Sequence, residues 1–330
     1  MIKTAITEMF GIQYPIVCGA MMWLAGPKLC AAISQAGGMG NLTSGSYETE
    51  ESFREAIHEI RRRTDKPFIV GLTLMPSVRI TPEMNRMYVR VAAEERVAAM
   101  EISGTPIDKG LGMEHLEQLK KAGVRVFHKV GALKHALHAQ KVGYDGVYCT
   151  GYEAGGHPHP DNVTSMVLTP TMVEALDIPV ISAGGMADGR SLAAALALGA
   201  QGIMMASRFI ATTECEVNDL FRQELVSRRE NETTLFGRQA LGIQGRALKN
   251  HLIEQVLAIE ESGGGLNELL PLISGERIRK AWDSGDVDEA PLMVGQSIGR
   301  IRVIASCAEV LGNMCTEARE YLQQARDMLG

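Results

Sequence analysis

Residues 179–207, PVISAGGMADGRSLAAALALGAQGIMMAS, hold two short apolar runs joined by a glycine-rich turn and a helical stretch. The runs PVISAG (179–184) and GIMMAS (202–207) have the length of β-strands, whereas GRSLAAALALG has the periodicity of a helix. Continuous apolar strands are typical of a parallel sheet covered by helices. The stretch therefore predicts a strand–helix–strand unit of an α/β protein.

The same unit recurs from residue 15 onward. The further apolar runs are PIVCGAM (15–21), MGNLT (39–43), PFIVGLTL (67–74), AAMEIS (98–103), RVFHKV (125–130) and DGVYCTG (145–151). Run starts lie roughly 20 to 34 residues apart, the spacing of βα units. An open doubly wound sheet is the alternative, but the sequence has neither its G-x-G-x-x-G string nor a Walker A motif. We therefore predict a TIM (β/α)8 barrel.

The repeat of strand and helix stops after residue 214. We predict three parts: an FMN-binding barrel over 1–215, a helical substrate-side lobe over 216–291, and a closing helical segment over 292–330 that packs on the barrel. The lobe is expected to lean on the barrel rather than to stand apart. No low-complexity segment or linker marks a clean boundary between the parts.

Bulk composition is that of a globular protein, with 330 residues, 45% hydrophobic and 22% charged. The net charge of −6 and the lack of basic clusters argue against nucleic-acid binding. No apolar run reaches the ~18 residues of a membrane helix, and the N-terminus lacks a signal-peptide core, so a cytoplasmic enzyme is expected.

The six cysteines show no C-x-x-C pair and no zinc spacing, and should be buried and free.

Two strand ends predict a phosphate site, because the loops after strands seven and eight of a TIM barrel commonly bind phosphate. Gly184-Gly185 follow the seventh run, with Asp188 as a helix N-cap, and Ala206-Ser207 follow the eighth. Alternatively, these glycines serve only tight turns. Arg208 could add positive charge to the site, or could pair with a neighbouring acid.

A phosphate site beside small residues suggests flavin mononucleotide as the ligand. The turn CGAMMW (18–23) would lie under its isoalloxazine ring, and Lys129, at the end of the fifth strand, would place a cation near the reduced ring. The alternative for Lys129 is an ion pair at the barrel rim.

The loop after the sixth strand, TGYEAGGHPHPDN, contains two histidines. We expect His157 to be catalytic, since imidazole exchanges protons near neutral pH and barrel enzymes place such groups at strand ends. Gly155-Gly156 would clear access to a ring below. His159, between two prolines, is expected at the rim. Only Glu153 and Asp161 could complete a zinc site with both histidines, so no metal is expected.

The segments GAMMWLAGPKLCAAISQAGGMGNL, YEAGGHP, ISAGGMADGRSLAAALALGAQGI, SRFIATTE and VGQSIG (294–299) together resemble the nitronate monooxygenase family, formerly called 2-nitropropane dioxygenases. This family is related to FMN-dependent enoyl-ACP reductases and NAD(P)H:quinone reductases. The resemblance implies an FMN-dependent oxidoreductase with His157 as its active-site histidine. The implied FMN-binding residues are Ala20, Met21, Met22, Gly71, Lys129, Ala154, Gly155, Gly156, Ser182, Gly184, Gly185, Ala206, Ser207 and Gln296.

Three positions depart from the family pattern. Ala206-Ser207 stand where Gly-Thr is common, and Gly71 stands where an asparagine usually faces the flavin. The loop reads GGHPHPD rather than AGGHxG, which leans toward the quinone reductases.

The leading hypothesis is oxidation of alkyl nitronates such as propionate 3-nitronate with O2. An NAD(P)H:quinone reductase is the alternative, with enoyl-ACP reduction behind it, and a barrel that binds flavin without catalysis is a third. The expected partners are a small-molecule substrate (nitronate or quinone), O2, NAD(P)H for a reductase, and a second copy of the chain in a homodimer, with no nucleic acid and no membrane.

Overall fold

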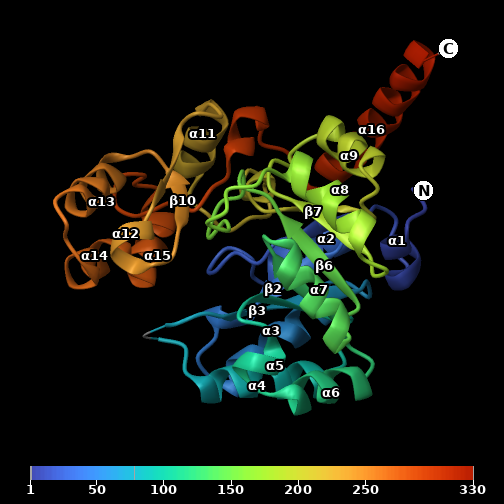
Figure 1. Cartoon of the computed structure of the whole chain (residues 1–330), viewed down its shortest axis with the longest axis horizontal. Helices are drawn as coiled ribbons and strands as arrows, with labels where there is room; N and C mark the ends of the chain where they lie inside the picture. Colours follow the sequence, from blue (N-terminus) through green and yellow to red (C-terminus); the bar gives the residue numbers. More distant parts are fainter. Residues whose placement is uncertain (1, 78, 330) are drawn as a thin grey trace.

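The computed structural model describes residues 2–77 and 79–329 and contains a barrel of eight parallel strands (Figure 1). The strands are β1 (Ile16–Cys18), β2 (Gly40–Thr43), β3 (Phe68–Leu74), β4 (Ala99–Gly104), β5 (Arg125–Val130), β6 (Gly146–Thr150), β7 (Val180–Ala183) and β8 (Ile203–Met205). Each lies within, or one residue beyond, an apolar run of the sequence. The repeat therefore located all eight.

The barrel closes between its first two strands. Strand β1 pairs with β8, β8 pairs with β7, and the pairing continues in descending order to β2. The remaining gap is bridged by Val17 and Met39, where Cys18 N–H donates to the Met39 carbonyl at 2.9 Å and Met39 N–H donates to the Ile16 carbonyl at 3.0 Å. The predicted TIM barrel is confirmed.

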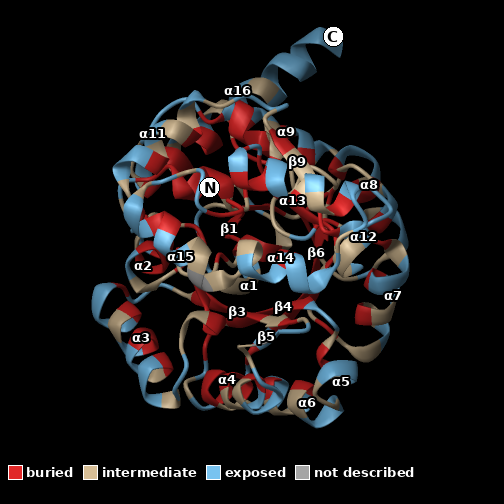
Figure 2. Cartoon of the chain, turned by 90° about the vertical axis from the view of Figure 1, so that its left-hand side faces the viewer, coloured by how far each residue is buried: buried red, intermediate tan, exposed pale blue. Residues whose placement is uncertain are grey.

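Helices and a short 3-10 turn connect the strands and cover the barrel. The helices bury the side that faces the barrel and expose their outer side (Figure 2). They are α2 (Pro27–Gln35), η1 (Ser44–Ser46), α3 (Glu50–Arg63), α4 (Pro82–Glu94), α5 (Ile107–Gly110), α6 (Met113–Lys121), α7 (Leu133–Val142), α8 (Ser165–Ala175), α9 (Gly189–Ala197) and α10 (Ser207–Ile210). Asp188 caps α9 as predicted: its side chain accepts from Ser191 N–H, and the Ser191 hydroxyl accepts in return from Asp188 N–H.

The amino-terminal end of the barrel is filled and capped. Helix α1 (Ala5–Phe10) lies across it, and buried Ile6 packs with the apolar residues of the lumen. Phe127 forms the centre of this packing, with its ring 5.9 Å from Phe10 and 5.4 Å from Tyr148. The lumen at this end is therefore filled by a hydrophobic core.

A lobe lies beside the opposite end of the barrel (Figure 1). It contains α11 (Asp219–Ser227), β9 (Thr233–Phe236), α12 (Arg238–Leu241), β10 (Gly245–Leu248), α13 (His251–Glu261), α14 (Leu266–Ile273) and α15 (Gly275–Ser284). Most of this lobe is helical, but β9 and β10 pair as an antiparallel hairpin that the sequence pattern did not predict. Their antiparallel pairing follows from the tertiary structure, and the sequence around them has a mostly helical pattern.

The final segment is only partly helical, which corrects the expectation of a closing helix from residue 292. Residues 292–306 form an irregular chain with the 3-10 turn η2 (Gln296–Arg300), because this part threads between the lobe and the barrel. Helix α16 (Cys307–Leu329) then packs on α9 and α2, and its last turns project away from the molecule (Figure 1). Across residues 2–77 and 79–329, no helix has the length and apolar character needed to cross a membrane.

Candidate active site

A cavity of about 780 Å³ opens at the carboxyl ends of the strands. The barrel side is lined mainly by small residues, among them Gly19, Ala20, Ala183, Gly184 and Ala206. The other side is lined by the lobe, through residues Arg238, Ile243, Gln244, Ile278 and Trp282. The lobe therefore covers the barrel mouth and forms part of one site with it.

Most of the residues expected to bind FMN line this cavity. They are Ala20, Met21, Met22, Lys129, Ala154, Gly155, Gly156, Gly184, Gly185, Ala206 and Ser207, and His157 joins them. Gly71, Ser182 and Gln296 are not among the lining residues. Ser182 faces away from the lumen, and its hydroxyl lies 2.8 Å from the Thr169 hydroxyl of α8.

The turns after β7 and β8 provide free backbone donors. Gly184 and Gly185 have φ values of 86° and 77°, a conformation that favours glycine. In the described part of the chain, neither N–H donates a hydrogen bond. The Ser207 hydroxyl accepts from Gly295 N–H at 3.0 Å, which joins this turn to η2. Free N–H groups in such turns suit an anion.

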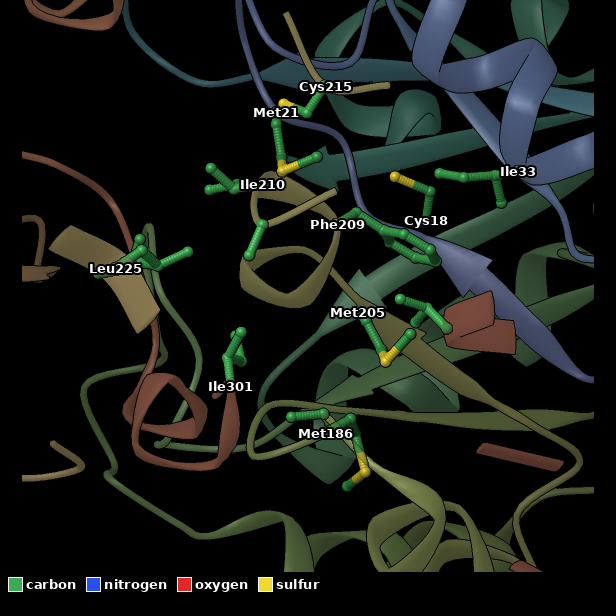
Figure 3. Packing of buried hydrophobic residues seen from close by; sticks show 14 of the residues in the cluster. Cys18, Met21, Ile33, Met186, Met205, Phe209, Ile210, Cys215, Leu225 and Ile301 are labelled. Carbon is green, nitrogen blue, oxygen red and sulfur yellow. The ribbon is translucent and has the colours of Figure 1, made fainter. Parts of the chain in front are cut away.

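Helix α10 is anchored below the second turn. Its Phe209 and Ile210 side chains lie in the same apolar cluster as Cys18, Met21 and Met205 (Figure 3). This packing fixes the position of the Ala206-Ser207 turn.

Arg208, on the same helix, is turned away from the cavity. Its guanidinium donates to the Val303 carbonyl at 2.9 Å and to the Ala211 carbonyl at 3.3 Å, and burial lowers its pKa. Both alternatives weighed from the sequence, an added charge for phosphate and a pair with an acid, were wrong. The side chain instead anchors the closing segment.

The loop that carries His157 is held by two later segments of the chain. Gly156 pairs with Arg246 of β10, through Arg246 N–H to the Gly156 carbonyl at 2.7 Å and the reverse bond at 3.2 Å. A Cβ on Gly155 would lie 2.5 Å from the carbonyl carbon of Val294. These glycines therefore permit close backbone contact and, at Gly156, a φ of 79°.

The His157 side chain is exposed within the cavity, and the walls of the cavity enclose it. This enclosure disfavours the imidazolium, and the nearby Lys129 ammonium disfavours it further, so the pKa falls to about 4. At neutral pH His157 is therefore an uncharged imidazole that can accept a proton or a hydrogen bond.

The second histidine lies at the rim, as expected. The His159 ring meets the His135 ring edge-on, with centroids 5.4 Å apart, and His159 Nδ1 lies 3.4 Å from an Asp161 carboxylate oxygen. Within the described ranges, no three His, Cys, Asp or Glu residues are grouped as metal ligands would be. The six cysteines are buried and free.

Lys129 faces the cavity and contacts an acid that the sequence analysis did not single out. Its Nζ lies 3.8 Å from Oε1 of Glu101, which projects from β4 and is 0% exposed. The neighbouring His128 points to the opposite side of β5, where Nδ1 lies 3.0 Å from the Ile102 carbonyl. The signal for Glu101 was present in AAMEIS, since an acid within an apolar strand is seldom buried without a partner.

Comparison with known proteins agrees with this geometry. The family model described as "Nitronate monooxygenase" matches residues 3–317. A (3aS,4S,5R,7aS)-5-hydroxy-7a-methyl-1-oxo-octahydro-1H-indene-4-carboxyl-CoA dehydrogenase from Rhodococcus jostii is 37% identical over 262 residues, which cover 79% of this chain and 69% of that protein. A probable nitronate monooxygenase from Staphylococcus aureus is 25% identical, over 97% of this chain and 99% of the relative.

The solved structure of FabK from Thermotoga maritima superposes with a TM-score of 0.89 at 32% identity, covering 99% of this chain and 100% of that one. The fold and these matches define an oxidoreductase built on a TIM barrel. Within that class, the chain belongs to the nitronate monooxygenase family. Its general function follows: it is an enzyme of a family of flavin oxidoreductases.

Proposed function

We propose that the protein binds FMN at the carboxyl end of the barrel and oxidises alkyl nitronates, such as propionate 3-nitronate, with O2. The observation that carries this proposal is the meeting of three features in one cavity. These are the Gly184-Gly185 and Ala206-Ser207 turns, the Lys129 ammonium and the uncharged His157 imidazole.

The cavity residues fit this cofactor. A volume of about 780 Å³ is in the range of ligand pockets, and the small residues at the barrel side leave room for a flat ring. The unpaired N–H groups of Gly184 and Gly185 suit the phosphate, and Ser207 would add its hydroxyl proton. Positive charge on Lys129 suits a ring that gains electrons.

When bound, FMN supplies electron transfer from the nitronate. The protein side chains bind and orient the substrate beside it. His157, uncharged above a pH of about 4, accepts a proton or a hydrogen bond from the substrate. We also assign the lobe 216–291 the substrate side of the cavity, where Trp282 and Ile278 exclude water from the reacting atoms. The working state is expected to be a cytoplasmic homodimer.

A second candidate is reduction or dehydrogenation of a larger substrate, such as an acyl thioester, with NAD(P)H as the hydride source for a reductase. The specific support is the extent of the cavity, which continues from the barrel to Arg238 and Trp282 of the lobe. The 37% identity to a dehydrogenase named for a CoA thioester supports the same candidate. Quinone reduction with NAD(P)H uses the same arrangement.

The test is anaerobic mixing of the FMN-loaded protein with propionate 3-nitronate, NADH, NADPH, or an enoyl-CoA in the presence of each nucleotide, while flavin absorbance is recorded. Loss of oxidised-flavin absorbance with the nitronate alone supports the proposal. Loss only with a pyridine nucleotide, followed by reoxidation with a quinone or the thioester, supports the second candidate. A folded, colourless protein that takes up no FMN overturns both.

A further inference from the structure

Glu101 is a carboxylate in the lumen of the barrel, beneath the cavity. It projects from the middle of β4 and is 0% exposed. A buried charge is costly unless it is paired and hydrogen-bonded, so its presence inside the barrel requires an explanation. The packing of the strands alone does not require an acid at this position.

Three polar side chains contact the Glu101 carboxylate, and all three offer it donors. Asn41 Nδ2 donates to Oε2 at 2.6 Å, the Ser103 hydroxyl donates to Oε1 at 3.1 Å, and Lys129 Nζ lies 3.8 Å from Oε1. A carboxylate accepts only, whereas a neutral acid would also have to donate. The surroundings therefore match the charged form, with Lys129 as its counter-ion.

Asn41 of β2 has room beside Glu101 because Gly71, on the neighbouring strand β3, has no side chain. A Cβ at Gly71 would lie 2.9 Å from Oδ1 of Asn41 and 2.7 Å from Cβ of Ala20, so the asparagine fits only because position 71 is glycine. Asn41 Nδ2 also donates a hydrogen bond to the Cys18 carbonyl at 3.1 Å. The carboxylate of Glu101 is thus fixed from β2 on one side and from β5 on the other.

The geometry points to Glu101 as a positioning residue that holds the Lys129 ammonium at the cavity and offsets its charge, thereby lowering the reduction potential of the bound flavin. This inference rests on the proposed function. Lys129 is 32% exposed and belongs to the cavity lining, whereas Glu101 is enclosed, so the cation reaches the ligand and the acid acts through it. In the barrel interior, solvent screens such charges weakly.

The experiment is a double-mutant cycle read by the midpoint potential of bound FMN. Glu101→Gln should raise the potential, with at least a tenfold change in the ratio of reduced to oxidised flavin, which corresponds to about 30 mV for a two-electron couple. Lys129→Met should lower it by a similar factor. The double variant, neutral at both positions, should return to within threefold of the wild-type ratio. Thr169→Val, which removes a buried hydrogen bond on the outer side of the barrel, should leave the potential unchanged.

The outcomes separate the two proposals. If wild type and Glu101→Gln bind FMN with equal potentials, this inference is overturned and the proposed function stands. If wild type takes up no FMN, both are overturned. Should Glu101→Gln not fold, the double variant is compared with Lys129→Met: a higher potential in the double variant supports the inference, and equal potentials overturn it.

Discussion

The two ends of the barrel are built from the same strands, but one end is filled by a hydrophobic core and the other opens into the cavity. On β5, Phe127 and Lys129 are two residues apart and face the same lumen. Phe127 packs with Tyr148 and Phe10 at the closed end, whereas Lys129 faces a cavity lined by glycine and alanine. Two positions along one strand therefore separate a side chain in the hydrophobic core from one that faces the cavity.

Replacing His157 by alanine should give the largest effect at the open end. Proton handling by a positioned side chain contributes about 10²–10⁴-fold, so turnover should fall by that factor while FMN stays bound. Steady-state kinetics and the flavin spectrum measure the two parts. As the matched control, His159→Ala at the rim should retain turnover within about fivefold. Unchanged turnover in His157→Ala would remove this residue from the mechanism.

At the closed end, Phe127→Ala should cost about 3–5 kcal/mol in the free energy of unfolding, because it removes a fully buried ring and leaves a cavity. Denaturant unfolding measures this change. Leu137→Ala, at an exposed position on α7, should cost well under about 1 kcal/mol. Equal losses for the two variants would contradict the assignment of the closed end as the stabilising core.

A pair of glycine substitutions compares the two ends directly. Gly184→Ala and Gly123→Ala both introduce a side chain at positive φ, 86° and 81°, at a backbone strain of about 1–2 kcal/mol each. The new Cβ at position 184 would also lie 3.0 Å from the Gly151 carbonyl oxygen, whereas the one at position 123 meets no atom within 4 Å. Both variants should be destabilised, but only Gly184→Ala, in the cavity lining, should weaken FMN binding, by roughly 5- to 30-fold. Titration with FMN measures this. Similar FMN affinities in the two variants would argue against a phosphate site at the β7 turn.

The smallest effect is expected from a change of pH near neutrality, which should leave the activity nearly constant. His157 has its pKa lowered to about 4, so the uncharged base is present from neutral pH down to about pH 5. Activity should therefore stay nearly constant over that range and decline as the pH falls through about 4. Because the folded state disfavours the protonated ring, stability from this group is full above the unfolded value of about 6.5 and is lost as the pH falls toward 4. A decline in activity centred near pH 6.5 would contradict the lowered pKa.

The sequence predicted the barrel well because each βα unit is encoded locally. The runs at 125–130 and 179–184 coincide with β5 and β7 to within a residue, and apolar periodicity requires no knowledge of the rest of the chain. Turn chemistry is similarly local, and it predicted the cap at Asp188.

The remaining features depend on contacts between distant residues. Asn41 and Glu101 are 60 positions apart and meet only because of the register of three strands, which periodicity does not specify. The orientation of Ser182 toward α8 also depends on register, which the glycine-rich motif around it does not reveal. The hairpin β9–β10 was missed because its pairing, like its contact with Gly156, follows from the tertiary structure.

The attachment of the His157 loop to Arg246 and Val294 has a consequence for the order of synthesis. All eight barrel strands have been made once residue 205 is complete, but the segments that hold Gly155 and Gly156 are synthesised later. When the last barrel strand has been made, the His157 loop thus still lacks two of its supports. The lobe and the loop also have to change together in evolution, because exchanging the lobe alone would remove the backbone partner of Gly156.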